Sequence, residues 1–508
     1  MNKKSLLLRI LVVCALVVPI AVQFASAAVA VDSSALRAAV TLDGVRAHQA
    51  AFQAIADANG GVRTSGTPGY DASAEYVAGL MDAAGYNVTV QPFDFAFFIE
   101  NTPATLEQTA PVPTVYGYAV DFLTMDYSGS GDVTAQVQAV DLVLPPGPTP
   151  STSNSGCEAS DFSGFTSGNI ALIQRGTCTF ALKAQNAEAA GAVGVIIFNE
   201  GQPGRQDLFG GTLGGPVVTI PVVSASFARG NEWANTPGLE MHLVTDTVSE
   251  IRSTRNVIAE TPGGRADRVV VVGAHLDSVA EGPGIQDNGS GSAAILEIAL
   301  QIAELGIQPT NKVRFAWWGA EESGLLGSEY YVSTLTKRDI KNIALNLNFD
   351  MIGSPNYVRF VYDGDGSATG IAGPNGSGNI EQVFTDYFAS QGLANEPTEF
   401  SGRSDYGPFI AVGIPAGGLF TGAEGVKTPE QVAIYGGTAG VAYDPCYHQA
   451  CDTFDNISLE ALDQMSDAVA HAVLTFAMTT SAVNGTDKGK GLGTFADSME
   501  YSGLLLRK

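Results

Sequence analysis

Histidines and acids recur at the ends of strand-like segments in this 508-residue chain. The sequence places His275 and Asp277 in G-A-H-L-D-S, Glu321 and Glu322 in W-W-G-A-E-E, and Asp350 in N-F-D-M-I-G. Imidazole and carboxylate groups are common ligands of zinc. A single histidine or a Glu-Glu pair is typical of an ordinary surface, so the indication of a metal site comes from their repetition.

Two further segments extend this set. Asp287 follows in the loop after the first segment, and Tyr447 and His448 lie far downstream in D-P-C-Y-H-Q-A-C-D. Five imidazole or carboxylate ligands on neighbouring strand ends suit a pair of zinc ions. Successive residues at a strand end point in different directions. Glu322 can therefore bind metal while Glu321 acts as general base on a metal-activated water, which is the division that hydrolysis needs.

The segments that must position these groups predict an α/β fold. Apolar runs over 268–274, 312–318 and 342–349 indicate buried strands, and 292–305 indicates a helix between the first two. We expect a mixed, mostly parallel sheet with helices on both faces. Ligand sites in such sheets lie at the carboxyl ends of the strands, where the acids and histidines are found.

The preceding part of the chain predicts more helices and an inserted unit. Residues 43–59 and 71–84 have helical patterns that end at glycines, and 86–95 alternates as a strand does. Between about 108 and 247, proline, glycine, serine and threonine dominate. This insertion contains one predicted β-α-β unit, at 169–174, 179–190 and 193–198. The expected divisions are a signal peptide at 1–27, the main domain at 31–108 and 248–480, an inserted domain at 109–247 and a flexible tail at 481–508.

The N-terminus has the features of a secretory signal. Lys3, Lys4 and Arg9 precede an apolar run over 10–22, and Ala25-Ser26-Ala27 offers a cleavage site. The run is shorter than the roughly 20 residues of a membrane span. A formal charge of -26 argues against nucleic acid and anionic membranes as partners. We expect a secreted protein, extracellular or periplasmic, that is a monomer without membrane attachment.

Four cysteines remain once Cys14 leaves with the signal. An even number in an exported chain indicates disulfides, and the positions group into two local pairs. These pairs are Cys157 with Cys178 and Cys446 with Cys451. The alternative, a four-cysteine metal site, lacks the C-x2-C spacing of structural zinc sites.

The spaced motifs resemble the co-catalytic two-zinc aminopeptidases of the bacterial leucine aminopeptidase type. The resemblance covers residues 31–108 and 247–480 and implies the zinc exopeptidase fold with two zinc ions per chain. It implies a ligand set of His275, Asp287, Glu322, Asp350 and His448, in which Asp287 bridges the metals. It further implies that Glu321 is the general base, Asp277 orients the first histidine and Tyr447 stabilises the oxyanion.

The same resemblance implies a substrate-binding region. The segment G-R-S-D-Y-G-P-F matches a substrate-contact segment, with Arg403 near the scissile carbonyl or product carboxylate and Asp405 as its support. Met351 and Phe420 would shape an apolar pocket for the first side chain. For Phe420 an ordinary core position is an equal alternative.

The inserted stretch resembles a protease-associated domain. The resemblance rests on G-N-I-A-L-I-Q-R-G-T-C-T-F and K-A-Q-N-A-E-A-A-G-A-V-G-V-I-I-F-N. No residue there pairs a nucleophile with a base. We interpret the domain as a lid or recognition module, with a purely structural spacer as the alternative.

The function expected is a secreted zinc aminopeptidase that removes large apolar residues from the N-termini of peptides or proteins. A one-zinc glutaminyl cyclase-type acyltransferase, a carboxypeptidase or dipeptidase, and a non-catalytic receptor of the transferrin-receptor kind are the alternatives. Asp463 and Asp467 lie four residues apart on an expected helix and repel each other. Either a bound calcium ion or solvation would relieve that repulsion.

Overall fold

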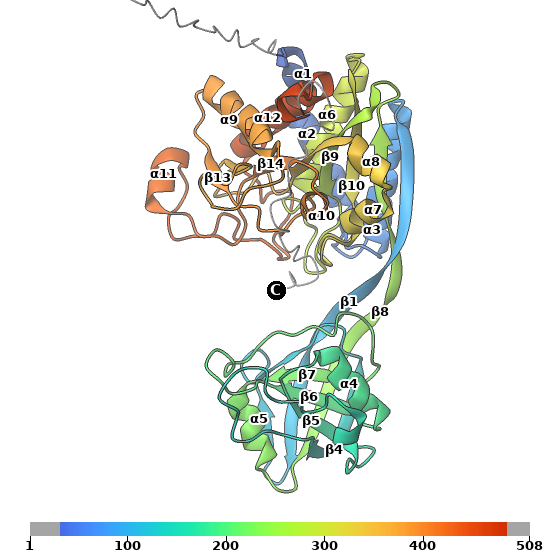
Figure 1. Ribbon diagram of the computed structural model, residues 1–508, viewed down its shortest axis with the longest axis vertical. Coiled ribbons are helices and arrows are strands. Elements are labelled where there is room, and N and C mark those ends of the chain that lie inside the picture. The colour runs from blue at the N-terminus through green and yellow to red at the C-terminus, as the bar shows by residue number, and fades with distance from the viewer. Residues whose placement is uncertain (1–30, 485–508) are drawn as a thin grey trace, which may run out of the picture.

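The structure, a computed structural model, describes residues 31–484 and consists of two lobes joined by a two-stranded ribbon (Figure 1). The ribbon is formed by β1 (Asn87–Ala110) and β8 (Glu240–Glu260), which pair as antiparallel neighbours from Asn87 with Glu260 to Ala110 with Glu240. The chain leaves the upper lobe on one strand and returns on the other, so the lower lobe is an insertion. The expected signal peptide and all but the first residues of the expected tail lie outside the described residues.

Parallel strands form the centre of the upper lobe. They are β14 (Ala416–Phe420), β11 (Ile343–Phe349), β9 (Arg265–His275) and β10 (Asn311–Trp318), in that order across the sheet. β8 is antiparallel to β10 on one side, and β12 (Phe360–Tyr362) is antiparallel to β14 on the other. β13 (Glu396–Thr398) forms the edge. The sheet is mixed and mostly parallel, as predicted.

Helices cover both faces of this sheet. Val270 and Val272 of β9 point into the larger core, and Val269 and Val271 point into a second core on the opposite face. The larger core is closed by α1 (Ser34–Ala39), α2 (Leu42–Ala58), α3 (Pro68–Ala83), α6 (Gly289–Glu304), α9 (Ser377–Ser390) and α12 (Leu459–Met478). The second core is closed by α7 (Leu326–Thr334), α8 (Lys337–Asn342) and α10 (Gly407–Ala411). Two short helices, α11 (Pro429–Tyr435) and α13 (Ser481–Asn484), complete the lobe.

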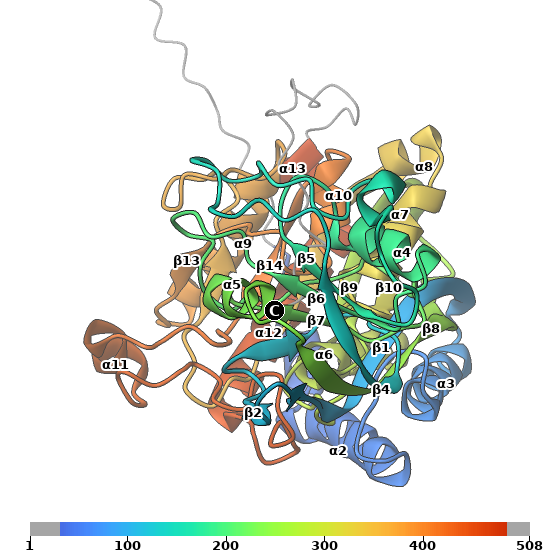
Figure 2. The ribbon, with the colours of Figure 1, turned by 90° about the horizontal axis from the view of Figure 1, so that it is seen from below.

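The lower lobe has its own sheet and its own cores. Its strands are β2 (Thr114–Tyr116), β3 (Phe122–Thr124), β4 (Gly131–Ala139), β5 (Ile170–Gln174), β6 (Gly194–Phe198) and β7 (Val222–Ala225). Its helices are α4 (Phe180–Ala189), α5 (Phe227–Ala234) and the 3-10 helix η1 (Ala159–Phe162). Apolar residues of this lobe and of the ribbon's lower end form two buried clusters. Seen from below, the lobe lies across the middle of the upper lobe (Figure 2).

The predicted elements are confirmed with shifts of a few residues at their ends, except for one strand. The helices expected at 43–59 and 71–84 are α2 and α3, and the β-α-β unit of the insertion is β5, α4 and β6. The strand expected to end at Phe95 continues to Ala110. Local alternation could not show this, because β1 is held by pairing with β8, more than a hundred residues later in the chain.

Both cysteine pairs predicted from the sequence are disulfides in the structure. Cys157 is bonded to Cys178, and Cys446 is bonded to Cys451. A four-cysteine metal site is therefore excluded. Among the described residues, the helices are all too short or too polar to cross a bilayer.

Candidate active site

The predicted acids and histidines meet at the carboxyl end of the parallel sheet. His275 is the last residue of β9, and Asp350 follows directly after the last residue of β11. Glu321 and Glu322 lie in the turn after β10. Parallel neighbours bring their carboxyl ends to one edge, so residues about 75 positions apart become neighbours. These four residues lie where the sequence predicted them, because ligand sites in such sheets are found at the carboxyl ends of the strands.

His275 lies among three carboxylates. Its Nε2 atom is 3.2 Å from Oδ1 of Asp287, 3.3 Å from Oδ1 of Asp350 and 3.9 Å from Oε2 of Glu321. The histidine side chain is almost fully buried. A small cation bound by His275, Asp287 and Asp350 would hold the imidazole nitrogen at about these two shorter distances from the carboxylate oxygens.

His448 forms a matching group on the other side of Asp287. Its Nε2 atom is 3.1 Å from Oε2 of Glu322 and 3.3 Å from Oδ2 of Asp287. Asp287 therefore turns one carboxylate oxygen toward each histidine. A carboxylate in this position can bridge two cations.

The donor set fits zinc. Tetrahedral zinc with bonds of about 2.0 Å places its ligand atoms about 3.3 Å apart, and the distances around both histidines are close to that value. Oε1 of Glu322 and Oδ1 of Asp350 are buried and have no hydrogen-bond partner in the described part of the chain. Buried carboxylate oxygens without a partner are costly, and a cation removes that cost.

The protonation equilibria of the cluster indicate the same demand for positive charge. Although burial acts in the opposite direction, Glu322 and Asp287 raise the pKa of His448 to about 11. Burial, followed by repulsion from Glu322 and Asp350, raises the pKa of Glu321 well above its ordinary value. The cluster holds more carboxylates than the two imidazoles can neutralise.

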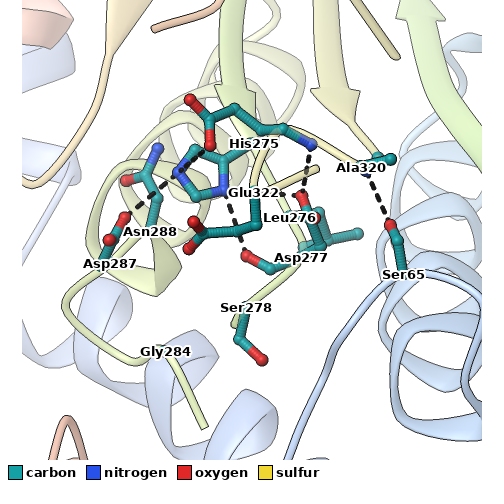
Figure 3. A network of polar contacts seen from close by, with 12 residues as sticks. Ser65, His275, Leu276, Asp277, Ser278, Gly284, Asp287, Asn288, Ala320 and Glu322 are labelled. Carbon is teal, nitrogen blue, oxygen red and sulfur yellow. Dashed lines mark hydrogen bonds and ion pairs between the residues drawn. The ribbon is translucent and has the colours of Figure 1, made fainter. Parts of the chain in front are cut away.

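Asp277 connects the ends of two strands next to His275 (Figure 3). Nδ1 of His275 lies 3.1 Å from the backbone oxygen of Asp277 and 3.6 Å from its Oδ1 atom. That Oδ1 atom accepts the backbone N–H of Glu321 at 3.2 Å. A group that accepts from Nδ1 leaves Nε2 free to bind a metal. Asp277 thus fixes the histidine and the start of the Glu-Glu turn together.

Arg63 is a functional residue that sequence reasoning missed. Its buried guanidinium donates to the carbonyl of Pro283 at 2.9 Å and to the carbonyls of Leu276 and Gly284. These carbonyls belong to the loop between His275 and Asp287. Burial lowers the pKa of Arg63 to about 10, still well above neutral pH. Arginine is not a usual metal ligand, so the type of residue gave no signal.

Asp452 is a second residue to which the sequence assigned no role. Its Oδ1 atom accepts the backbone N–H of Gln286 at 2.8 Å, and its Oδ2 atom accepts that of Asp287 at 2.9 Å. Asp452 directly follows Cys451, whose disulfide closes the loop that carries His448. The last ligand loop is therefore bonded to the backbone of the bridging aspartate.

Ser404 supports the third carboxylate. Its hydroxyl donates to Oδ2 of Asp350 at 2.6 Å and accepts from Nδ2 of Asn348 at 2.8 Å. The residue lies in G-R-S-D-Y-G-P-F, between the two residues that the sequence singled out. A serine oriented by an asparagine can stabilise one carboxylate oxygen while the other remains available.

Arg403 lies at the mouth of the site. It forms an ion pair with Glu424, Nη1 to Oε1 at 2.7 Å, and its Nη2 atom is 3.4 Å from the hydroxyl of Tyr447. Its carboxylate partner is thus Glu424, where the sequence led us to expect Asp405. Asp405 is instead buried near Asp350 and Asp277, and burial raises its pKa to about 7.

A cavity of 290 Å³ opens beside the cluster. Its lining includes Met351 and Phe420, the two residues expected to shape an apolar pocket. Phe360, Tyr362 and Tyr443 extend the aromatic lining. Phe420 stacks on Phe360 with ring centroids 6.1 Å apart. Part of the cavity wall is therefore apolar and aromatic, and the same cavity reaches His275 and the acids.

One of the two acids considered for calcium has an arginine partner. Oδ2 of Asp467 lies 3.6 Å from Nη1 of Arg37. The positive charge of Arg37 opposes the repulsion that Asp463 exerts on Asp467. The structure therefore offers an explanation for these two acids that needs no calcium ion.

Comparison with known proteins gives consistent matches. The model of peptidase family M28 matches residues 256–473, and that of the PA domain matches residues 137–233. The chain is 52% identical to an aminopeptidase of Pseudomonas aeruginosa over 85% of this chain and 80% of that protein. It is 48% identical to leucine aminopeptidase 2 of Trichophyton equinum over 64% of this chain and 65% of that one. A zinc aminopeptidase from Bacillus subtilis superposes with a TM-score of 0.55 at 27% identity, covering 85% of this chain and 94% of that chain.

Proposed function

The chain belongs to peptidase family M28, with an inserted PA domain, and on that basis we propose that it is a secreted two-zinc aminopeptidase that removes large apolar residues from peptide N-termini. One observation carries the two-metal assignment. Asp287 directs one oxygen to His275 and the other to His448, and each histidine has a further carboxylate beside it.

These distances support the following assignment of metal ligands. His275, Asp287 and Asp350 would hold one zinc ion, and His448, Glu322 and Asp287 would hold the other. Zinc supplies Lewis acidity, which polarises the scissile carbonyl and makes water acidic enough to react near neutral pH. Arg63 and Asp452 hold the backbone on either side of the bridge, so the ligands are positioned before substrate arrives.

Glu321 is the proton carrier in this proposal. It lies next to the ligand Glu322 but is farther from His275 than Asp287 or Asp350 is. As a carboxylate it accepts a proton from the attacking water, and as an acid it gives the proton to the leaving nitrogen. Its backbone N–H donates to Asp277, which fixes the position from which its side chain extends.

Tyr447 is placed to stabilise the developing oxyanion. Its ring stacks on that of His448 with centroids 3.8 Å apart, which holds the hydroxyl at the edge of the cluster. Burial, followed by the charges of Asp287 and Glu322, raises the pKa of Tyr447. The hydroxyl therefore stays protonated and can donate a hydrogen bond. Arg403 adds positive charge next to it.

The exopeptidase direction requires recognition of a free amino group. Glu321 and Asp350 lie at the inner end of the aromatic cavity, where charge-assisted hydrogen bonds to an ammonium group can form. The first side chain of the substrate would then occupy the compartment of Met351 and Phe420. This arrangement supports large apolar residues as the preferred first residue.

The two disulfides of the chain support the proposal that the protein is secreted. Two disulfides are typical of an oxidising compartment outside the cytoplasm. We assign the inserted domain to residues 109–247 and the catalytic unit to residues 31–108 and 248–480, so that the ribbon of β1 and β8 crosses from one to the other. For the PA domain we propose a role as a lid or recognition module, with a purely structural spacer as the alternative.

Hydrolysis of leucyl and phenylalanyl anilides tests this function. Both should be cleaved, their N-acetylated forms should be inert, and a chelator should abolish cleavage. Metal analysis should give two zinc ions per chain, whereas a cyclase of the one-zinc type should give one. Rapid cleavage of an acetylated substrate would contradict the aminopeptidase assignment even with both ions present.

A further inference from the structure

A second cavity adjoins the catalytic cluster on the side of the inserted domain. It measures 560 Å³, which is within the range of about 300 to 1,000 Å³ typical of ligand sites. It shares five lining residues with the aromatic cavity, namely Glu321, Glu322, Arg403, Tyr447 and His448. The two cavities therefore meet at the reacting centre.

The walls of this second cavity come from three separate parts of the fold. The ribbon contributes its segment from Phe97 to Asn101, the lower lobe contributes Asp126, and the upper lobe contributes 278–281 and 323–325. The ribbon segment is fixed, because Glu100 accepts a hydrogen bond from the Tyr118 hydroxyl at 2.6 Å and another from Thr124. The insertion thus builds one wall of a compartment that opens on the active site.

We propose that this cavity holds the leaving part of the peptide and favours lysine or arginine at the second or third residue of the substrate. This inference rests on the aminopeptidase function proposed above. A peptide bond at the metal cluster has its first residue on one side and the rest of the chain on the other. The aromatic cavity takes the first residue, so the remaining residues extend into the second cavity.

The charge of the second cavity's lining indicates which kind of substrate side chain it would favour. Outside the shared residues, the lining includes Glu100, Asp126 and Glu281 and no lysine or arginine. Glu281 is exposed and has no hydrogen bond or ion pair with any other residue between 31 and 484. A carboxylate without a partner at the rim of a cavity can pair with a cationic side chain of the substrate.

Peptides that differ only in this charge test the proposal. Pentapeptides that begin with leucine carry lysine, glutamine or glutamate at position two in one series and at position three in another. In at least one series kcat/KM should be about fivefold or more higher for lysine than for glutamate at low salt, and the ratio should shrink as salt rises. Equal values for lysine, glutamine and glutamate in both series would overturn the proposal, as would a preference for glutamate.

Two charge reversals separate the cavity from the general field of this acidic protein. Glu281→Lys should remove or invert the preference for lysine and leave cleavage of leucyl p-nitroanilide within about twofold. Glu304→Lys, at the exposed end of α6, introduces the same change of charge away from the cavity and should preserve the preference. Equal loss in both variants would mean long-range steering and would overturn the proposal.

The anilide also separates this inference from the function on which it rests. A wild-type enzyme that does not cleave leucyl p-nitroanilide contradicts the aminopeptidase assignment itself. A wild-type enzyme that cleaves the anilide but shows no charge preference in the peptides overturns only the leaving-peptide cavity.

Discussion

At the residue scale, two adjacent glutamates have different surroundings and therefore different expected effects when changed. Glu322 lies 3.1 Å from His448, whereas Glu321 is 3.9 Å from His275, and burial raises the pKa of both carboxyl groups. Glu321→Gln should keep both zinc ions and lower kcat by about a hundredfold or more, because an amide cannot accept a proton. Glu322→Gln is the matched control and should lower zinc content together with activity. Metal analysis and leucyl anilide kinetics check both variants, and a Glu321→Gln protein that lacks one zinc but remains active would make Glu321 a ligand.

At the scale of an element, the loop between Cys446 and Cys451 links a ligand, the oxyanion donor and the bridge. It carries Tyr447 and His448, and the following Asp452 accepts two backbone N–H groups next to Asp287. Replacing both cysteines of this loop by serine should reduce kcat/KM about tenfold or more. The same change should lower the free energy of unfolding by at most about 2 kcal/mol, because the closed loop is short.

The disulfide between Cys157 and Cys178 provides the control for that experiment. It closes a longer loop in the lower lobe, and no residue of that loop lines either cavity. Its removal should cost about 3 kcal/mol of unfolding free energy and leave leucyl anilide kinetics nearly unchanged. Normal activity per folded molecule in the Cys446→Ser, Cys451→Ser variant, with a large fall in unfolding midpoint, would contradict the positioning role of the loop.

At the scale of the whole molecule, the two lobes have separate cores, so the stability of the lower lobe can change without a change in catalysis. Lys183 is buried in that lobe beside the carbonyl of Ser155, and burial lowers its pKa to about 8. Between pH 8 and about 10 the folded state loses this proton while the unfolded state keeps it. The wild-type lobe should therefore become more stable as pH rises through this window.

Lys183→Met tests that contribution. The variant lacks the titrating group, so its unfolding free energy relative to wild type should fall by about 1 to 2 kcal/mol from pH 8 to pH 10. Lys337→Met, at an exposed position of α8, should show no such trend. Calorimetry over this pH range measures the difference, and leucyl anilide cleavage should stay the same in both variants. Parallel pH profiles for wild type and Lys183→Met would show that the buried amine does not control stability.

Much of the catalytic site could be predicted from the sequence because its signal is local. His275 ends an apolar strand, and Glu321, Glu322 and Asp350 closely follow others, and parallel strands bring their carboxyl ends together. His275, Glu321, Glu322 and Asp350 are therefore close in the structure, as their positions after β9, β10 and β11 indicated. The two cysteine pairs also followed from local spacing and composition.

The supporting residues and the second cavity were decided by the tertiary structure alone. Arg63 and Asp452 act through backbone atoms of segments more than 150 residues away, and backbone hydrogen bonding leaves no pattern of residue types in the sequence. Arg403 pairs with Glu424, although Asp405 is closer to it in the sequence. The fold of the chain decides which carboxylate reaches the guanidinium. The length of β1 and the wall that it forms beside the active site depend on pairing with β8, and such long-range pairing is specified only when the whole chain is folded.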